Sequence, residues 1–290
     1  MCCETYNYQN QPFMYSVLDK DTIALEIVPY IPKTNRGFAP TVPLVEIVNA
    51  ILYKLKTGVQ WYQLPVKALF DSKVLSWQSV YYHYRKWCLC GFWKDCWVNF
   101  LHRHKSKLDL SSVDLDGSHT SAIKGGEQVE YQARKRRKTT NALYLSERQG
   151  LPLAMSEPLA GNHNDLYDIE VQFEVVTGTL KDADLSVEGL FLNADAGFDS
   201  KDFRQACAQE QINANICFNR RNGDRDRDDY FDKELYDQRY VIERTNAWMD
   251  SFRSLLNRFD TTVASWTGFN YLAFIVLALK KFKPFKKEKV

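Results

Sequence analysis

Three acidic residues lie in sequence contexts that suit carboxylates bound to metal ions. Asp116 closes the largely apolar stretch 113–116, Asp195 follows the apolar run 190–194, and Glu243 lies within a helical pattern. Two metal ions about 3.5–4 Å apart can activate a water molecule and stabilise the alkoxide that leaves during phosphodiester hydrolysis. Because Mg²⁺ prefers hard oxygen ligands, two or three carboxylates that converge from separate elements would suit such a reaction.

The neighbouring acids Asp114 and Asp199 compete for the same roles. Side chains two residues apart in a strand point to the same face, so spacing alone does not separate Asp114 from Asp116. Asp199 follows Asp195 closely and is also interpreted as a helix cap. Each acid has an ordinary explanation as well, because aspartate beside glycine begins turns and Glu243 beside an arginine is typical of an exposed helix surface.

The helical pattern around Glu243 contains two further residues that could bind phosphate. Tyr236, Arg239 and Glu243 are spaced at i, i+3 and i+7, which places three side chains on one face of a helix. A tyrosine and an arginine beside a metal-binding glutamate can hold phosphate groups near the metal. We therefore expect Asp116 and Asp195 at the ends of strands, with the helix that carries Glu243 beside them.

Taken together, these contexts resemble the signature regions of bacterial insertion-sequence transposases of the DDE class, the IS-four/IS-five group. The resemblance implies that Asp116, Asp195 and Glu243 are the catalytic residues and that they hold Mg²⁺ or Mn²⁺, as two ions. It favours Asp116 over Asp114 because a Gly-Ser-His cluster follows, as in the family. It favours Asp195 over Asp199 because a glycine and an aromatic residue follow.

The resemblance extends from about residue 36 to residue 282, and one position departs from it. Residues 161–165 and 125–140 are also similar to family segments, although a helix cap is the simpler interpretation of the former. The family often has a lysine seven residues after the glutamate, where this chain has Asp250. Arg253, about one turn further on, is an alternative source of that positive charge.

Charge is concentrated in two basic clusters, although the formal net charge of the 290 residues is only +2. Residues 280–290 carry six lysines against one glutamate. Such clusters bind phosphate backbones, and each alone is equally typical of a solvated face or a frayed tail. The predicted DNA-binding residues are Tyr236 and Arg239 together with five consecutive cations, Arg134, Lys135, Arg136, Arg137 and Lys138.

Cysteine and histidine usage argues against a zinc site and for a reducing compartment. The seven cysteines form no paired C-x-x-C motif and the five histidines supply no zinc spacing. An odd number of cysteines without a secretory signal favours free thiols in the cytosol, so a cytoplasmic protein is expected. Residues 263–279 carry no charge but are short and partly polar for a membrane span, so a buried helix is predicted and no membrane partner is expected.

The first part of the chain is predicted to be helical. Residues 1–40 are irregular and are interpreted as a flexible N-terminal arm. Residues 41–108 contain three helical patterns, the first capped by Thr41 and ended by Gly58 and the second capped by Ser76. They are expected to form a small all-α domain, which is compatible with a helix-turn-helix that binds DNA and equally with a plain bundle.

From about residue 110, predicted strands alternate with helices. Strands are expected at 112–116, 139–146, 151–159, 189–194 and 212–218, and helices at 164–176, 201–209 and 233–258, with a charged loop over 220–229. The first of these helices is expected to begin at an Asn164 cap. This order resembles an α/β ribonuclease-H-like fold, which we assign to a catalytic domain over residues 109–282, followed by a basic tail at 283–290.

The expected function is that of a transposase, which cleaves the ends of an insertion element and joins the exposed 3′-hydroxyl to target DNA. Its partners would be the terminal inverted repeats, the target DNA and further copies of the chain in the active complex. Two alternatives stay open: a metal-dependent nuclease without strand transfer, and a DNA-binding relic that has lost catalysis. The three intact acidic residues argue against the relic, whereas the nuclease would use the same site.

Overall fold

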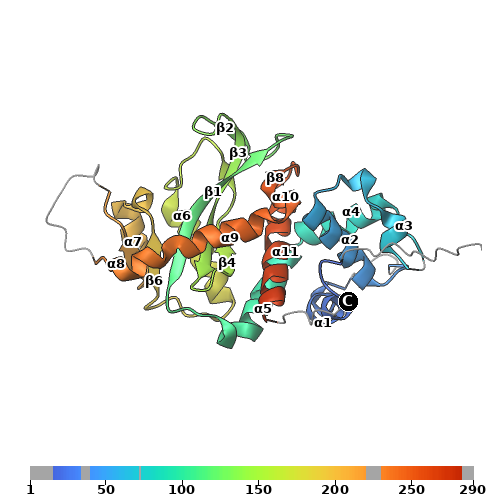
Figure 1. Ribbon diagram of the computed structural model, residues 1–290, viewed down its shortest axis with the longest axis horizontal. Helices are drawn as coiled ribbons and strands as arrows, with labels where there is room; N and C mark the ends of the chain where they lie inside the picture. The colour runs from blue at the N-terminus through green and yellow to red at the C-terminus, as the bar shows by residue number, and fades with distance from the viewer. Residues whose placement is uncertain (1–15, 34–39, 72, 220–229, 283–290) are drawn as a thin grey trace, which may run out of the picture.

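The computed structural model describes residues 16–33, 40–71, 73–219 and 230–282 (Figure 1). Helices form the first part of the chain, and a mixed sheet with helices on both sides forms most of the rest. The predicted α/β class with a helical region in front of the sheet is therefore confirmed. The expected charged loop at 220–229 and basic tail at 283–290 lie outside the described residues.

Helix boundaries in the first part follow local capping. Helix α4 begins where predicted, because the Ser76 hydroxyl accepts a hydrogen bond from the Ser79 backbone N–H at 3.3 Å. Helix α2 ends at Gly58, whose φ of 69° favours glycine. The cap expected at Thr41 is wrong, because Pro43 holds the N-cap position of α2. The helices are α1 (Lys20–Glu26), α2 (Leu44–Thr57), α3 (Val66–Leu69), α4 (Trp77–Leu89) and α5 (Phe92–His104), with 3₁₀ turns at Val28–Tyr30, Trp61–Gln63 and Lys105–Lys107.

Part of the expected N-terminal arm is ordered core structure. Within residues 16–33, Ile23 and Ile27 are fully buried. The carboxylate of Glu26 is also buried and accepts a hydrogen bond from Arg103 on α5 at 3.0 Å. The interpretation as a flexible arm is therefore wrong for this segment, because apolar residues too few to form a visible periodic pattern pack against later helices. Residues 1–15 and 34–39 lie outside the described residues.

The sheet has the strand order β2-β3-β1-β6-β7. Strand β1 runs antiparallel to β3 and parallel to β6, and β6 runs parallel to β7. Strands β4 and β5 pair with β3 on the side away from β1, and β8 pairs with the far end of β1. The strands are β1 (Val113–Ala122), β2 (Glu130–Gln132), β3 (Arg137–Glu147), β4 (Pro152–Met155), β5 (Leu159–Ala160), β6 (Phe191–Ala194), β7 (Asn213–Ile216) and β8 (Asn257–Arg258).

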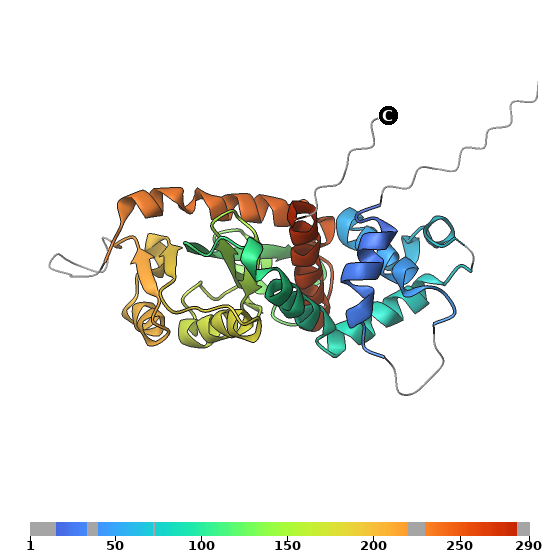
Figure 2. The same cartoon turned by 90° about the horizontal axis from the view of Figure 1, so that it is seen from below.

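The sheet is covered on both faces (Figure 2). Helix α9 lies along one face, whereas α6 and α7 lie on the other. Helix α6 begins at Ile169 and not at Asn164, because the Asn164 side chain closes a local turn by accepting the Leu166 N–H at 3.1 Å. The helices are α6 (Ile169–Asp182), α7 (Lys201–Gln209), α8 (Lys233–Tyr236), α9 (Tyr240–Asp250), α10 (Arg253–Leu256) and α11 (Val263–Phe282), with 3₁₀ turns at Ala196–Phe198 and Asp237–Arg239. The continuous helix expected over 233–258 is therefore wrong, since it is divided into α8, α9 and α10.

Helix α11 joins the helical region to the sheet through one shared core. The Tyr84 ring of α4 stacks on Phe269 of α11 at 4.3 Å between centroids. The Trp97 indole packs against Phe274 of α11 and donates a hydrogen bond to the Leu153 carbonyl at 2.7 Å. Among the described residues α11 is the one helix whose length and hydropathy would suit a membrane span, and 72% of its apolar window is buried within the protein. The predicted buried helix is therefore confirmed.

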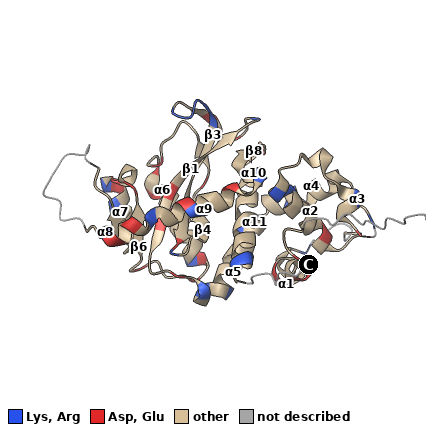
Figure 3. Cartoon of the chain, in the orientation of Figure 1, with Lys and Arg blue, Asp and Glu red and all other residues tan. Residues whose placement is uncertain are grey.

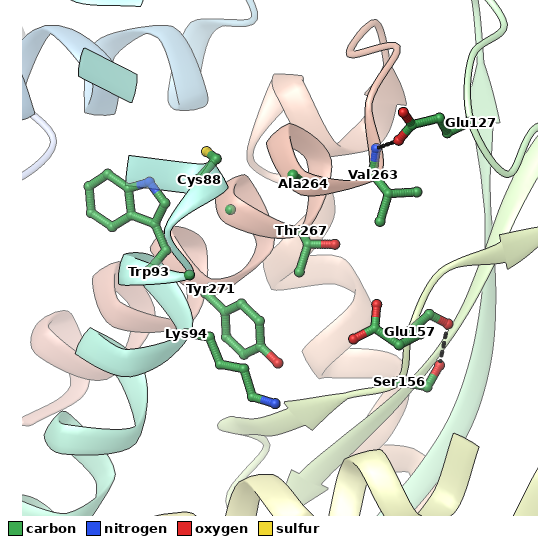
Figure 4. Close-up of a pocket in the computed structure, with 12 residues that line it drawn as sticks. Cys88, Trp93, Lys94, Glu127, Ser156, Glu157, Val263, Ala264, Thr267 and Tyr271 are labelled. Atoms are coloured by element: carbon green, nitrogen blue, oxygen red, sulfur yellow. Dashed lines mark hydrogen bonds between the residues drawn. The ribbon is translucent and has the colours of Figure 1, made fainter. Parts of the chain in front are cut away.

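The N-terminus of α11 is anchored by the turn that follows β1. The Glu127 N–H donates to the Thr261 carbonyl at 2.8 Å, and its carboxylate accepts the Val263 N–H at 2.8 Å (Figure 4). A carboxylate at a helix N-terminus is favourable because the first backbone N–H groups have no partner within the helix. Gly126 brings the turn this close, since its φ is 127° and a Cβ there would lie 2.3 Å from the Thr261 carbonyl oxygen.

Adjacent glycines in this turn provide a matched test of that anchor. We expect Gly126→Ala to lower the free energy of unfolding by more than about 2 kcal/mol, because the new Cβ meets backbone in a conformation open mainly to glycine. Gly125→Ala should cost only about 1 kcal/mol, since its φ is 74° but nothing lies within 4 Å of the added Cβ. Chemical denaturation of the two variants measures the difference. Equal losses would show that α11 does not depend on this close approach.

Candidate active site

Strand register brings Asp116 and Asp195 to neighbouring positions. The parallel pairing of β1 with β6 aligns Val113 with Leu192 and Asp114 with Asn193. Extended by two residues, the same register places Asp116 beside Asp195, which directly follows β6. The strand end expected at Asp116 is wrong, because β1 continues to Ala122. The strand that ends beside Asp116 is β6, whose last residue is Ala194. Pairing of β1 with β6 stops just before this point, so both carboxylates lie at the end of the paired region.

Asp114 and Asp116 point to the same face of β1 but have different surroundings. Asp114 is only 2% exposed and accepts a hydrogen bond from the Asn193 amide at 2.9 Å. Asn193 in turn accepts one from Asn215 at 2.8 Å, so Asp114 belongs to an internal network across three strands. Asp116 is half-buried, and the Asn246 amide of α9 lies 3.4 Å from its carboxylate. Of the two aspartates, Asp116 is therefore the one that faces α9.

The charge state of Asp116 is governed by burial and by its charged neighbours. Burial raises the pKa of Asp116 to about 6, the Arg239 guanidinium opposes that shift, and the negative charges of Asp195 and Asp165 add to it. Burial likewise raises the pKa of Asp114 to about 6. Acidic groups that lie together out of water disfavour ionisation, and a cation placed between them reverses this effect.

Asp195 forms the cap of the 3₁₀ turn that follows β6. Its carboxylate accepts a hydrogen bond from the Gly197 N–H at 2.8 Å, which fixes one oxygen. The competing acid, Asp199, is buried and pairs with Arg204 at 2.9 Å. It is not the helix cap that the sequence suggested, because Ser200 caps α7 through the Phe203 N–H. Asp199 is therefore part of the interior, whereas Asp195 lies at the strand end.

Glu243 lies on α9 between two residues that reach Asp116. Arg239 acts on Asp116 through its charge, and Asn246 approaches it directly. The spacing of residues 239, 243 and 246 puts Glu243 on the same helix face. Glu243 is exposed, and within the described part of the chain no three acidic, histidine or cysteine side chains are close enough together to hold a metal ion. The structure thus brings Asp116 and Asp195 together and leaves Glu243 beside the pair, not in contact with it.

Tyr236 and Arg239 border the two aspartates. The Arg239 guanidinium lies over the Tyr236 ring, 5.7 Å from its centroid. Burial raises the pKa of the Tyr236 hydroxyl, Arg239 opposes the shift and the charge of Asp195 adds to it. The pair is not held by one regular helix as expected, because residues Asp237–Arg239 form a 3₁₀ turn between α8 and α9.

Sequence reasoning missed the part played by Asp165. Its carboxylate accepts a hydrogen bond from Asn141 on β3 at 2.7 Å and lies 3.9 Å from His119. It covers Gly117, where an added Cβ would lie 2.2 Å from the Asp165 oxygen. The interpretation of residues 161–165 as a helix cap does not include this contact; the sequence signal for it is the glycine after Asp116, which allows another chain segment to approach β1. Asp165 is a third acidic group whose charge reaches Asp116.

The five cations of the basic run are exposed near the tip of the β2–β3 hairpin (Figure 3). Lys135 donates to the His119 carbonyl at 2.8 Å, and Arg137 donates to the Ser121 hydroxyl at 3.2 Å. Both contacts fold the turn over the far part of β1. Partial burial raises the pKa of Asp250 on α9, and the charge of Lys135 opposes this shift. The hairpin therefore places a positive charge beside α9, near Asp250, the position that departs from the resemblance.

Arg253 does not replace the missing lysine. Its Cβ lies against Gly58 at the end of α2, where an added Cβ would be only 2.8 Å away. It is thus directed toward the helical region and away from the aspartate pair. The reason is the break at residues 251–252 between α9 and α10, which changes the helix face that Arg253 occupies.

A cavity of about 400 Å³ lies elsewhere, between α4, α5 and α11 (Figure 4). Its lining is mostly apolar and includes Cys88, Trp93, Thr267 and Tyr271, with Lys94, Glu127 and Glu157 at its border. Neither Asp116 nor Asp195 contributes to it. The aspartate pair lies at the end of the paired region between two inner strands, β1 and β6, and is separate from this cavity.

Two family models match the chain. The model for transposases of the IS4/5 family matches residues 25–97, and the model for the transposase DDE domain matches residues 107–278. No curated protein matches. Among solved structures, the chain is similar to the Mos1 strand transfer complex (11% identity, 85% of this chain and 79% of that chain, TM-score 0.31). It is also similar to a pre-cleavage Mos1 transpososome (12% identity, 88% and 83%, TM-score 0.28).

The raised pKa of Asp116 predicts how stability depends on pH without metal. The folded state binds the proton more tightly than the unfolded chain, so stability falls as pH rises from the ordinary value of 3.8 to about 6 and stays lower above it. Asp116→Asn should therefore raise the free energy of unfolding in EDTA at pH 7, by up to about 3 kcal/mol. Chemical denaturation at pH 7 and at pH 4 measures this, and the gain should largely disappear at pH 4. An Asn variant that is less stable than the parent at both pH values would contradict the assignment.

Proposed function

The chain belongs to the DDE-domain transposases of the IS4/5 family, and on that premise we propose that it cleaves DNA at a site formed by Asp116, Asp195 and Glu243. The observation that carries the proposal is the register of β1 on β6, which sets two carboxylates side by side where β6 ends. The shared face of α9 supplies the third acid next to them. The strand order, with β1 antiparallel to β3 and parallel to β6, supports a ribonuclease-H-like catalytic domain.

The residues present fit a hard divalent cation, Mg²⁺ or Mn²⁺. Carboxylate oxygens are the ligands that such ions prefer, and burial keeps the pKa of Asp116 raised until a cation compensates its charge. Asp116 and Asp195 would hold two ions, and Glu243, which does not contact the pair in this structure, would have to approach them to complete the set. Bound there, the ions supply an activated water molecule and stabilise the oxygen that leaves the scissile phosphate.

The surrounding side chains position the acids and the DNA. Asn246 donates toward Asp116 at 3.4 Å and so favours one orientation of that carboxylate. Arg239 can hold a phosphate oxygen while Tyr236, stacked beneath its guanidinium, limits the movement of that arginine. After cleavage, the same arrangement would hold the exposed 3′-hydroxyl for attack on a phosphate of the target DNA.

The helical region over residues 41–108 is proposed to recognise the element ends. The buried face of α4 packs on α11, which leaves Gln78, Tyr82 and Arg85 exposed on the opposite face. Those three side chains could enter a major groove. Removal of residues 1–105 is not a usable test, because it would uncover Phe269 and Phe274 of α11.

We further propose that the protein acts in the cytoplasm on inverted repeats and target DNA, and that two or more copies pair the ends.

Two other functions would use parts of the same structure. A nuclease without strand transfer would keep the aspartate pair and differ only in its products. The neighbouring positions of Asp116 and Asp195 argue against a relic without catalysis. Two nearby carboxylates repel each other and lower the stability of the protein, and a protein without catalysis would gain nothing from them. Detection of joined DNA products separates the transposase from the nuclease.

Asp195→Asn tests the catalytic assignment. We expect Mg²⁺-dependent nicking of element-end DNA to fall on the order of 10³-fold or more, because several kcal/mol of transition-state stabilisation depends on the bound metal. DNA binding in EDTA should persist. The matched control is Glu210→Gln, an acid on the far side of the sheet that pairs with Lys181. Nicking and joining of labelled duplexes are the measurements, and near-normal nicking by the Asn variant would refute the assignment.

The basic run is expected to contact phosphates and not bases. The double variant Arg136→Gln/Arg137→Gln should weaken binding equally on element-end and scrambled duplexes, because adjacent cations carry charge but no base code. The slope of log affinity against log salt should fall by roughly 0.9 for each lost contact. Fluorescence anisotropy at several salt concentrations measures both effects. An unchanged slope would leave the run as a solvated surface.

A further inference from the structure

Two cations, Lys56 and Arg253, lie together where the helical region joins the sheet domain, and the charge of Lys56 also acts on a third cation, Lys280. Lys56 lies in the last turn of α2, Arg253 begins α10, and Lys280 lies in the last turn of α11. The Lys56 ammonium donates to the Ser251 hydroxyl at 3.1 Å and lies 4.9 Å from the centre of the Phe252 ring. These contacts hold it against the segment that leads into Arg253.

The charge of Lys56 is coupled to each of the other two. Burial lowers the pKa of Lys56, and the charge of Arg253 lowers it further. Burial also lowers the pKa of Lys280, and the charge of Lys56 adds to that shift. Arg253 is exposed, whereas both lysines are partly withdrawn from water. Like charges in this arrangement repel, and partial burial strengthens the repulsion.

No carboxylate compensates these charges within the described residues. None of the three cations takes part in an ion pair there, although other lysines do. Lys281, next in sequence to Lys280, pairs with Glu147 at 2.8 Å, and Lys105 pairs with Asp184 at 2.7 Å. A favourable helix dipole explains one lysine at the end of α2 and one at the end of α11. It does not explain why Lys56 lies near an arginine that has no acidic partner among the described residues, with Lys280 close enough for its pKa to respond to the charge of Lys56.

We propose that Lys56, Arg253 and Lys280 form a second phosphate-binding site, which holds the backbone of duplex DNA away from the cleavage point. An anion is the partner that removes the mutual repulsion, and closely spaced phosphates suit three separate cations. The inference rests on the proposed function, because it requires DNA to lie along α9. The part of α9 from Glu243 to Asp250 spans roughly 10 Å, and the duplex carries about one charge per 1.7 Å.

The arrangement of α8, α9 and α10 supports this path. The three helices follow one line along one side of the molecule, from the part that holds β6 and β7 toward α2 (Figure 2). Lys or Arg segments lie at the end of α2 that faces α10 (Figure 3). A duplex that contacts Arg239 beside the acids would thus meet Lys135 near Asp250 and then the three-cation site. The site would fix the angle at which DNA leaves the catalytic residues.

The test compares Lys56→Gln/Lys280→Gln with Lys105→Gln/Lys181→Gln, which removes the same charge from lysines paired with acids. Both are measured in EDTA by fluorescence anisotropy on a 30-base-pair duplex, so that cleavage is not needed. We expect the first variant to bind about tenfold more weakly and to lower the salt slope by about 1.8, whereas the control should change little. Its melting temperature without DNA should be equal to or higher than that of the parent, since repulsion has been removed.

Arg253→Gln, at an exposed position, provides a second variant should the double variant fold poorly. It should lower the slope by about 0.9. Equal slopes for the site variants and the control would overturn the proposal. So would unchanged duplex binding combined with loss of binding to inorganic phosphate or to anionic phosphatidylserine vesicles. Failure of the proposed function would be a separate result. It would appear as persistent nicking of DNA by Asp195→Asn, and it would not depend on how tightly the lysine and arginine variants bind DNA.

Discussion

The parallel pairing of β1 with β6 is the constraint on which the site depends. Two paired positions, Val113 with Leu192 and Asp114 with Asn193, set a register that puts Asp116 level with Asp195. A shift of one residue would turn the carboxylates to opposite faces of the sheet. The internal network from Asp114 through Asn193 to Asn215 resists such a shift, because it would leave buried polar groups without partners. The hydrogen bonds of the buried Asp114 thus help to fix the position of Asp116.

Helix α11 plays the corresponding part at the level of the whole molecule. It is buried between the helical region and the sheet, where Phe269 contacts Tyr84 and Phe274 contacts Trp97. Each fully buried large apolar side chain contributes about 1.5–3 kcal/mol, so the two regions stabilise each other. The helical region is consequently not an independent domain attached to the rest by a linker. DNA bound to it would be held in a defined relation to the aspartate pair.

Two groups of like charge lie in partly buried positions. Asp116 lies near Asp195 and Asp165, and Lys56 lies near Arg253 and Lys280. Each group lowers the stability of the protein alone and favours a partner of opposite charge. The first suits divalent cations and the second suits phosphates. Because α9 and α10 run between them, binding at both would place one nucleic acid along a single side of the protein.

Much of the fold was determined locally and could be predicted from the sequence. Ser76 and Gly58 set helix ends through their own backbone chemistry, and the uncharged stretch of α11 indicated a buried helix. The predicted acids Asp116 and Asp195 do lie together, because apolar runs before them form strands.

Sequence did not show that Asp114 and Asp199 are committed to internal partners, that Asp165 covers Gly117, or that Arg253 turns toward α2. These outcomes depend on contacts between residues far apart in the chain, and the order of residues contains no direct signal for such contacts. The same reason explains the three-cation site: each lysine or arginine alone is an ordinary surface charge, and only packing of α2, α10 and α11 makes them neighbours.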